Sequence, residues 1–231
     1  MATILKAENI IKYFTSPIKF KALDNISFEI QESEFVTIIG KSGCGKSTLL
    51  YILSTMDTDY EGKIYFDQQL ITGLKQNELA KLRNGSIGFI FQFHYLLPEF
   101  TALKNIMIPA MKLGNYSYEE IEHRAYEKLK LLGVEEQALK PASKLSGGQQ
   151  QRIAIARALI NDPKIIMCDE PTGNLDSKNT AIVLETFKQI SKEFNQTIIA
   201  VTHDADFAKA SDRTIEMADG KIISYGLKHF S

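Results

Sequence analysis

The sequence has few cysteines and no excess of charge of either sign. Its two cysteines, Cys44 and Cys168, stand in a glycine-rich stretch and in an apolar run, so we expect no structural disulfide and a reducing, cytoplasmic compartment. The 27 Lys and Arg residues balance 28 Asp and Glu residues, for a formal net charge of −1. Nucleic-acid-binding proteins usually carry a basic excess, so we expect no nucleic acid among the partners.

Long apolar runs are also lacking. No run approaches the ~18 residues that span a bilayer, and residues 1–6 do not have the layout of a signal peptide. If the protein works at a membrane, we therefore expect a partner subunit to hold it on the cytoplasmic side. The 231 residues suffice for one sizeable α/β core.

The most informative stretch is residues 40–48, which read Gly-Lys-Ser-Gly-Cys-Gly-Lys-Ser-Thr. They match the P-loop pattern G-x-x-x-x-G-K-[ST] between a buried-strand run at 35–39 and a helical run. Backbone N–H groups at the helix N-terminus would cradle the phosphates of a nucleoside triphosphate, Lys46 would reach the β- and γ-phosphates, and Ser47 would bind Mg²⁺. The alternative, a glycine-rich turn without a ligand, does not explain the complete pattern. The predicted nucleotide contacts are Gly40, Lys41, Ser42, Gly43, Cys44, Gly45, Lys46, Ser47 and Thr48.

A second apolar run, residues 165–168, ends in two adjacent carboxylates, Asp169 and Glu170. In P-loop ATPases a strand of this kind lies beside the P-loop strand and delivers its first carboxylate to Mg²⁺, which predicts Asp169 as a metal ligand. Glu170 would point the other way and orient or deprotonate the attacking water. The alternative is a strand that ends in charges because it reaches solvent, and the intact P-loop disfavours it.

A third motif, Leu145-Ser-Gly-Gly-Gln149, opens the helix predicted at 149–160. Its hydroxyl and free N–H groups suit a second phosphate, although an ordinary serine N-cap is the alternative. The motif resembles the signature of ATP-binding-cassette (ABC) proteins, and the resemblance covers nearly the whole chain. It implies that ATP is the nucleotide and that Ser146, Gly147, Gly148 and Gln149 contact it.

The resemblance to ABC proteins implies further site residues. Gln92, which follows the strand predicted at 87–91, corresponds to a glutamine that contacts Mg²⁺ and senses the γ-phosphate, and His203 corresponds to a histidine that supports hydrolysis together with Glu170. Residues 174–176 correspond to the family's D-loop. Tyr13 corresponds to the aromatic that stacks on adenine, although an aromatic at a strand end usually only packs. The family forms head-to-tail dimers, so residues 146–148 of one chain would close over the ATP held by the other chain of a homodimer.

The expected fold class is α/β, with a P-loop NTPase (RecA-like) core, an antiparallel β-layer and an inserted helical subdomain. Apolar runs predict parallel strands at 35–39, 87–91, 165–168 and 197–201, and alternating segments predict the β-layer at 3–10, 26–30 and 62–66. Helical patterns occupy 102–113, 118–132 and 149–160, and a glycine turn joins a hairpin of 213–217 and 221–225. We expect one ABC nucleotide-binding domain, residues 1–231, with 1–92 and 164–231 forming the β-layer and core and 93–163 the helical subdomain.

Finer resemblances point to one group of ABC ATPases. Residues 94–106 are similar to the lipoprotein-releasing ATPases (LolD), and residues 170–176 to a wider group with the macrolide exporters (MacB) and the cell-division ATPase FtsE. Residues 149–152 are more similar to the macrolide exporters. The resemblance implies an ATPase that powers lipoprotein release from the inner membrane with LolC/LolE-like membrane subunits. Macrolide export and FtsE-like regulation of cell-wall enzymes stay as alternatives. A soluble ABC ATPase of DNA repair or translation is disfavoured, because the chain has neither a coiled-coil insertion nor a second cassette.

A contact with the membrane subunit is predicted at residues 95–100, directly after Gln92. Aromatic and leucine side chains around Pro98 would form an apolar groove for a partner helix. The alternative is that the apolar residues of this region belong to the core of the helical subdomain; these are Leu96, Leu97, Phe100, Leu103 and Ile106.

Overall fold

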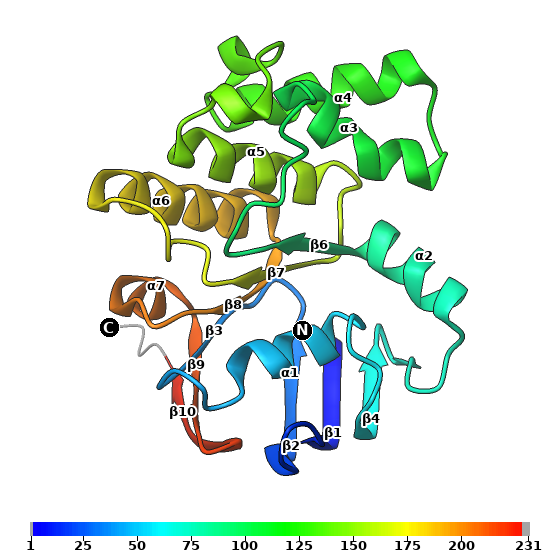
Figure 1. Ribbon diagram of the computed structural model, residues 1–231, viewed down its shortest axis with the longest axis vertical. Coiled ribbons are helices and arrows are strands. Elements are labelled where there is room, and N and C mark those ends of the chain that lie inside the picture. The colour runs from blue at the N-terminus through cyan, green and yellow to red at the C-terminus, as the bar shows by residue number, and fades with distance from the viewer. Residues whose placement is uncertain (1, 228–231) are drawn as a thin grey trace.

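Two β-sheets organise the computed structural model, which describes residues 2–227 (Figure 1). The larger sheet has the strand order β10-β9-β3-β8-β7-β6, and the smaller one has the order β2-β1-β4-β5. The strands of the larger sheet are β3 (Phe35–Gly40), β6 (Ile87–Ile90), β7 (Ile165–Asp169), β8 (Thr197–Val201), β9 (Arg213–Ala218) and β10 (Lys221–Leu227). The strands of the smaller sheet are β1 (Thr3–Phe14), β2 (Phe20–Gln31), β4 (Glu61–Phe66) and β5 (Gln69–Leu70).

The four predicted parallel strands lie side by side in the larger sheet, with β6 at its edge. β3 pairs with β8, β8 with β7 and β7 with β6, all in parallel. Every residue of β7 and β8 is buried, as expected for strands covered on both faces. β9 runs parallel to β3, and β10 returns antiparallel to β9 after the turn at Asp219 and Gly220, which confirms the predicted hairpin.

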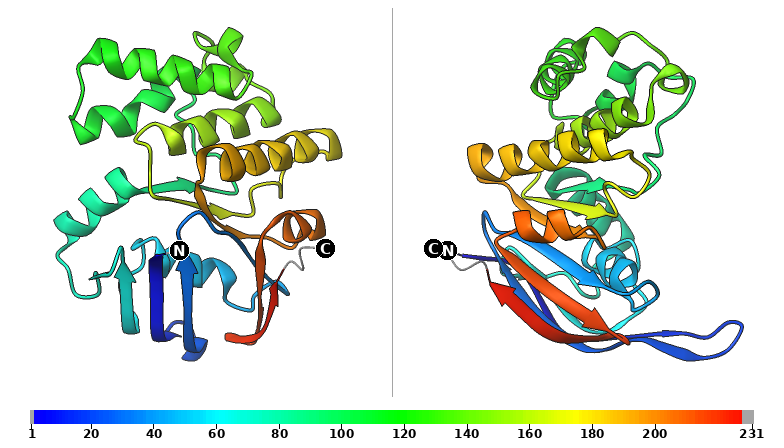
Figure 2. Two further views of the ribbon diagram at one scale, coloured as in Figure 1. Left: turned by 180° about the vertical axis from the view of Figure 1, so that it is seen from behind. Right: turned by 90° about the vertical axis from the view of Figure 1, so that its left-hand side faces the viewer.

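The antiparallel layer is longer than the sequence pattern predicts. β1 and β2 each extend over 12 residues and form a hairpin that projects beyond the rest of the molecule, seen in blue in the right-hand view of Figure 2. Register shifts interrupt their pairing, including one between Lys12 and Tyr13. These irregularities break the alternation of buried and exposed residues, so the apolar pattern ends before the strands do.

Helices cover both faces of the larger sheet. The three predicted helices are observed as α3 (Ala102–Leu113), α4 (Tyr118–Leu131) and α5 (Gly147–Leu159), and they gather beyond β6 and β7 at one end of the molecule (Figure 1). Each begins at a side chain that accepts a hydrogen bond from the first turn, namely Thr101, Ser117 and Ser146. The other helices are α1 (Lys46–Leu53), α2 (Gln76–Ser86), α6 (Ser177–Phe194) and α7 (Ala205–Ala210), with short 3₁₀ turns η1 (Glu135–Gln137) and η2 (Ala142–Lys144).

Two apolar clusters lie on opposite faces of the parallel strands. Ile166 and Cys168 of β7 pack in the cluster that also contains α3, α4 and α5, whereas Ile165 and Met167 pack in the cluster that contains α1 and the antiparallel layer. This alternation follows from the two-residue period of a strand. The sheet therefore holds α1 on one face and the helical group on the other. The division of the domain at residues 93 and 163 stays a prediction.

Candidate functional site

The P-loop joins β3 to α1 and folds around its own lysine. Gly45 caps α1 in a left-handed conformation, with φ of 103°. The ammonium of Lys46 bends back over the loop and donates to the carbonyls of Gly40, at 2.9 Å, and of Lys41, at 3.0 Å. The first N–H groups of α1 have no partner within the helix, so the loop presents free donors and a cation to one space, as phosphate binding requires.

Two glycines of the loop are required by close packing. A Cβ atom at Gly40 would lie 2.2 Å from the carbonyl oxygen of Met217, and one at Gly45 would lie 2.7 Å from that of Ala22. Backbone atoms cannot move away as a flexible side chain can. The loop thus fits against β9 and β2 only with glycine at these two positions.

A cavity of about 670 Å³ opens over the P-loop. It brings Gln92, Glu170 and His203 together with most of the predicted loop residues. Cys44 does not line it, because the Cys44 side chain is buried in the apolar cluster beneath the loop. The P-loop residues that line the cavity are Gly40, Lys41, Ser42, Gly43, Gly45, Lys46, Ser47 and Thr48.

Asp169 lies at the base of the site, at the end of β7, and is 5% exposed. The hydroxyl of Ser47 donates to its Oδ1 at 2.8 Å, and the hydroxyl of Tyr51 donates to its Oδ2 at 2.9 Å. Burial, followed by the hydrogen bond to Asp169, raises the pKa of Tyr51 to about 12. A carboxylate beside a serine hydroxyl is a set of hard oxygen donors, which suits Mg²⁺.

Glu170 and His203 meet across the carboxyl ends of β7 and β8. Glu170 Oε2 lies 3.0 Å from His203 Nδ1, but the two groups lack the alignment of a hydrogen bond, so this buried oxygen has no hydrogen-bond partner among residues 2–227. The Glu170 backbone is left-handed, with φ of 48°, and its N–H donates to the carbonyl of Val201 at 2.9 Å. Glu170 also lines the cavity, and a carboxylate in this position can act as a general base toward a bound water.

Gln92 connects the cavity to the segment that follows Glu170. Asn174 Nδ2 donates to the Gln92 carbonyl at 2.8 Å, and a Cβ atom at Gly173 would lie 3.2 Å from Gln92 Nε2. Asp176 then caps α6 by accepting a hydrogen bond from the N–H of Asn179. Asn174, the first residue of the predicted D-loop, therefore contacts the predicted glutamine directly.

The aromatic residues that line the cavity differ from the predicted one. Phe14 and Phe20 line it, with ring centroids 5.4 Å apart, and are 37% and 54% exposed. Tyr13 does not line it, and its ring lies beneath the amines of Lys19, at 4.7 Å, and Lys21, at 5.6 Å. Adjacent strand residues point to opposite faces, so Phe14, one position after the predicted Tyr13, is the residue that faces the cavity.

The signature motif lies apart from the P-loop cavity. Ser146 caps α5 through a capping box, in which its hydroxyl accepts from the Gln149 N–H at 3.4 Å and its own N–H donates to Gln149 Oε1 at 2.9 Å. None of the residues 146–149 lines the cavity over Lys46. Within one chain, the structure does not bring the two predicted phosphate-binding loops together.

A groove of about 340 Å³ follows Gln92 in the chain. It is lined by Phe93, His94, Tyr95, Leu96, Pro98, Ala142, Ser143, Gln150 and Asn174. Tyr95 is 65% exposed, and Leu97 and Phe100 are exposed nearby, whereas Leu103 and Ile106 are buried. The segment therefore divides into a surface part and a core part. Burial lowers the pKa of His94, so its imidazole is neutral at pH 7.

Arg157 of α5 fixes the backbone of this groove, and the sequence analysis missed it. Its guanidinium donates to the carbonyls of His94, at 2.6 Å, and Tyr95, at 2.7 Å. These hydrogen bonds cannot be predicted from the local sequence pattern, because their acceptors are 62 and 63 positions away in the chain.

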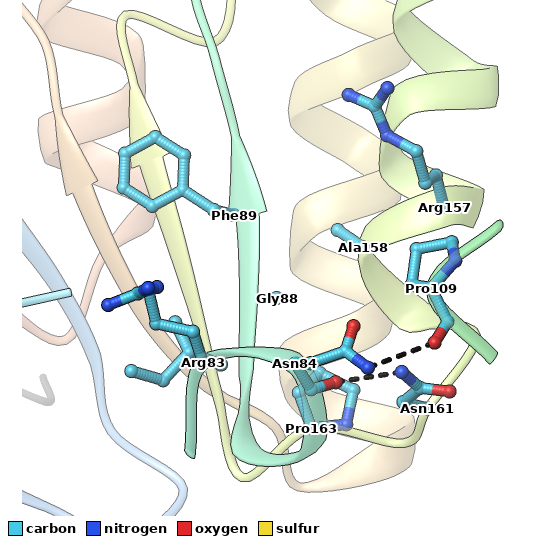
Figure 3. Close-up of a pocket in the computed structure, with 10 residues that line it drawn as sticks. Arg83, Asn84, Gly88, Phe89, Pro109, Arg157, Ala158, Asn161 and Pro163 are labelled. Atoms are coloured by element: carbon cyan, nitrogen blue, oxygen red, sulfur yellow. Dashed lines mark hydrogen bonds between the residues drawn. The ribbon is translucent and has the colours of Figure 1, made fainter. Parts of the chain in front are cut away.

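A smaller cavity of about 120 Å³ lies between β6, α2, α3 and α5 (Figure 3). Asn161 Nδ2 donates to the Asn84 carbonyl at 2.7 Å, and Asn84 Nδ2 donates to the Pro109 carbonyl at 3.0 Å. A Cβ atom at Gly88 would lie 2.5 Å from the Ala158 carbonyl oxygen. This cavity contains no P-loop residue, and its lining joins the sheet to the helical group.

Comparison with known proteins identifies the family. The family model described as ABC transporter matches residues 23–173. The chain belongs to the ABC transporter family. It is 46% identical to the "Lipoprotein-releasing system ATP-binding protein LolD" of Aquifex aeolicus over 96% of this chain and 97% of that protein. It is also 46% identical to the protein of the same name from Bacteroides fragilis, over 95% of this chain and 100% of that protein.

A solved ABC structure shares the fold. The chain is similar, with a TM-score of 0.90 and 40% identity over 97% of this chain and 98% of the other, to an ATP-binding cassette solved as a dimer in a post-hydrolysis state with ADP and phosphate. This ABC protein is thus an ATP-binding ATPase, and the predicted α/β P-loop fold with its antiparallel layer and helical group is confirmed. No helix among residues 2–227 is both long enough and apolar enough to cross a bilayer.

Proposed function

We propose that this chain is the ATP-hydrolysing subunit of a lipoprotein-releasing ABC transporter, bound on the cytoplasmic side of the inner (plasma) membrane. The observation that carries the proposal is the 44–46% sequence identity to proteins named LolD, over nearly the whole length of this chain and of each of those proteins. The P-loop cavity supports the ATPase part, because it combines a phosphate-binding loop with a carboxylate that can activate water.

Within the cavity, Lys46 would neutralise the β- and γ-phosphates, and Ser47, Asp169 and Gln92 would hold Mg²⁺. The bound Mg²⁺ would neutralise charge on the phosphates during hydrolysis. Glu170 would take the proton of the attacking water, and His203, whose Nδ1 lies 3.0 Å from Glu170 Oε2, would face the γ-phosphate and support hydrolysis. Phe14 replaces Tyr13 as the proposed adenine-stacking residue, with Phe20 beside it.

The complete site would form between two copies of the chain. Residues 146–149 carry a capped helix N-terminus suited to phosphate, yet they do not line the cavity of their own chain. A head-to-tail homodimer would bring this loop over the ATP held by Lys46 of the partner subunit. The dimeric state of the similar ATP-binding cassette supports the arrangement.

The groove after Gln92 would receive a helix of the membrane subunit. Its walls are largely apolar and aromatic, Phe100 is 43% exposed beside it, and Arg157 holds its backbone in place. The Gln92 carbonyl accepts a hydrogen bond from Asn174, which also lines the groove. A movement of Gln92 when the γ-phosphate is lost would therefore reach the groove, and with it the membrane subunit, through a single hydrogen bond.

Affinity purification of the tagged chain from membranes tests the proposal. We expect a membrane subunit of the lipoprotein-releasing type to be recovered, whereas a macrolide-exporter or FtsE-type partner would overturn the assignment to lipoprotein release. Phe100→Asp should leave ATP affinity unchanged and reduce recovery of the complex. Phe194→Asp is the matched control, because Phe194 is 54% exposed at the end of α6 and does not line the groove.

A further inference from the structure

The carboxylate of Asp169 is held between two hydroxyls from one face of α1. Ser47 and Tyr51 are four positions apart and therefore project from the same side of the helix. Ser47 donates to one carboxylate oxygen at 2.8 Å, and Tyr51 donates to the other at 2.9 Å. Each oxygen of Asp169 thus has its own donor.

The hydroxyl of Tyr51 is a polar group in largely apolar surroundings. Its neighbours in α1, Leu49, Leu50, Ile52 and Leu53, are buried and apolar, and its ring lies 6.0 Å from the ring of Phe89. A phenylalanine would satisfy this packing, because burying a hydroxyl costs free energy unless it is hydrogen-bonded. The hydrogen bond to Asp169 is what the hydroxyl adds.

We propose that Tyr51 is a positioning residue for the metal-binding carboxylate of Asp169. The inference rests on the proposed Mg²⁺ site and adds a residue that the P-loop pattern does not contain. Tyr51 holds Oδ2, so the plane of the carboxylate is fixed and Oδ1 stays directed toward Ser47. When Mg²⁺ binds, Ser47 can turn its hydroxyl oxygen to the ion while the Tyr51 hydrogen bond keeps the carboxylate in place.

Loss of such a supporting hydrogen bond typically weakens metal affinity by about 10- to 100-fold. We therefore expect Tyr51→Phe to raise the Mg²⁺ concentration for half-maximal effect by about 10-fold or more. The affinity for nucleotide in the absence of Mg²⁺ should stay unchanged, because Tyr51 does not line the ATP cavity.

The experiment measures binding of a fluorescent, non-hydrolysable ATP analogue to the full chain, first in EDTA and then in a Mg²⁺ titration. Tyr60→Phe is the matched control, because it removes a phenol hydroxyl that bonds to Thr72 at 2.9 Å, away from the site. Asp169→Asn tests the proposed metal site itself. A normal Mg²⁺ response in Asp169→Asn would refute that site, whereas a normal response in Tyr51→Phe alone would refute only the positioning role.

An equal loss of affinity with and without Mg²⁺ in Tyr51→Phe would also overturn the proposal, because the defect would then lie in the cavity and not at the metal. Thermal unfolding without nucleotide checks that each variant is folded. If Tyr51→Phe is not recovered in folded form, Tyr51→Leu, which also lacks the hydroxyl, is judged by the same two measurements.

Discussion

Adjacent glycines in the signature motif should respond in opposite ways to alanine. A Cβ atom at Gly147 would meet only Leu175, at 4.0 Å, and the residue is exposed. A Cβ atom at Gly148 would lie 2.0 Å from Asn179 Oδ1 and 3.1 Å from Asn179 Cβ, and the residue is buried. Asn179 cannot turn away freely, because its Nδ2 bonds to both carboxylate oxygens of Asp176 at 3.0 Å.

The magnitudes follow from two opposing effects. Alanine in place of glycine within a helix stabilises by about 0.5–1 kcal/mol, because the unfolded chain loses freedom. A methyl group forced into a packed contact costs about 1–3 kcal/mol. Gly147→Ala should therefore stabilise the fold by about 0.5–1 kcal/mol, and Gly148→Ala should destabilise it by about 0.5–2 kcal/mol.

Thermal unfolding of the nucleotide-free chain measures this difference. At about 2–4 °C per kcal/mol for a domain of this size, Tm should rise by about 1–4 °C in Gly147→Ala and fall by about 1–8 °C in Gly148→Ala. The double variant Gly148→Ala with Asn179→Ala should be less destabilised than the sum of its single variants by about 1 kcal/mol, because the obstructing amide is gone.

Either of two results would refute the reasoning. One is a Tm of Gly148→Ala at or above that of Gly147→Ala, which would mean that the Asn179 side chain moves aside without lowering the stability of the fold. The other is strict additivity in the double variant, which would place the strain away from Asn179.

The remaining predictions concern the active site. Glu170→Gln should keep ATP binding, lower hydrolysis by about 10²-fold or more, and give an ATP-dependent dimer in size-exclusion chromatography; hydrolysis at the wild-type rate would exclude Glu170 as the base. Mixing Ser146→Arg with Lys46→Ala should restore activity, since one site of the heterodimer is then intact; heterodimers without activity would count against the head-to-tail site or indicate strict coupling of the two sites. Phe14→Ala should weaken ATP binding about 10-fold, as loss of base stacking does, and more than Tyr13→Ala; the reverse order in a binding titration would reinstate Tyr13.

Local chemistry explains what could be predicted from the sequence. The P-loop, the largely apolar strands and the helices capped by Ser or Thr depend on residues within a few positions of one another, and β3, β7, β8, α3, α4 and α5 match their predicted ranges closely. Asp169 and Glu170 were predicted as site residues in the same way, because adjacent residues at a strand end must reach the same edge of the sheet.

The position of Tyr13 outside the cavity lining has a physical cause. Neighbouring strand residues face opposite sides, so a shift of one position exchanges a cavity wall for the far face of the sheet. Register shifts in β1, one of them beside Tyr13, remove the regular alternation that would have indicated the correct side. Pairing with β2 decided that Phe14 faces the nucleotide cavity.

The sequence by itself determined that this chain has a P-loop ATPase core of the ABC type, because each motif is a short run with its own chemistry. Only the tertiary structure decided which distant groups meet. The contacts of Arg157 with His94, of Tyr51 with Asp169 and of Gly148 with Asn179 join residues 31 to 118 positions apart. Such contacts depend on strand order and helix packing, which no local pattern encodes.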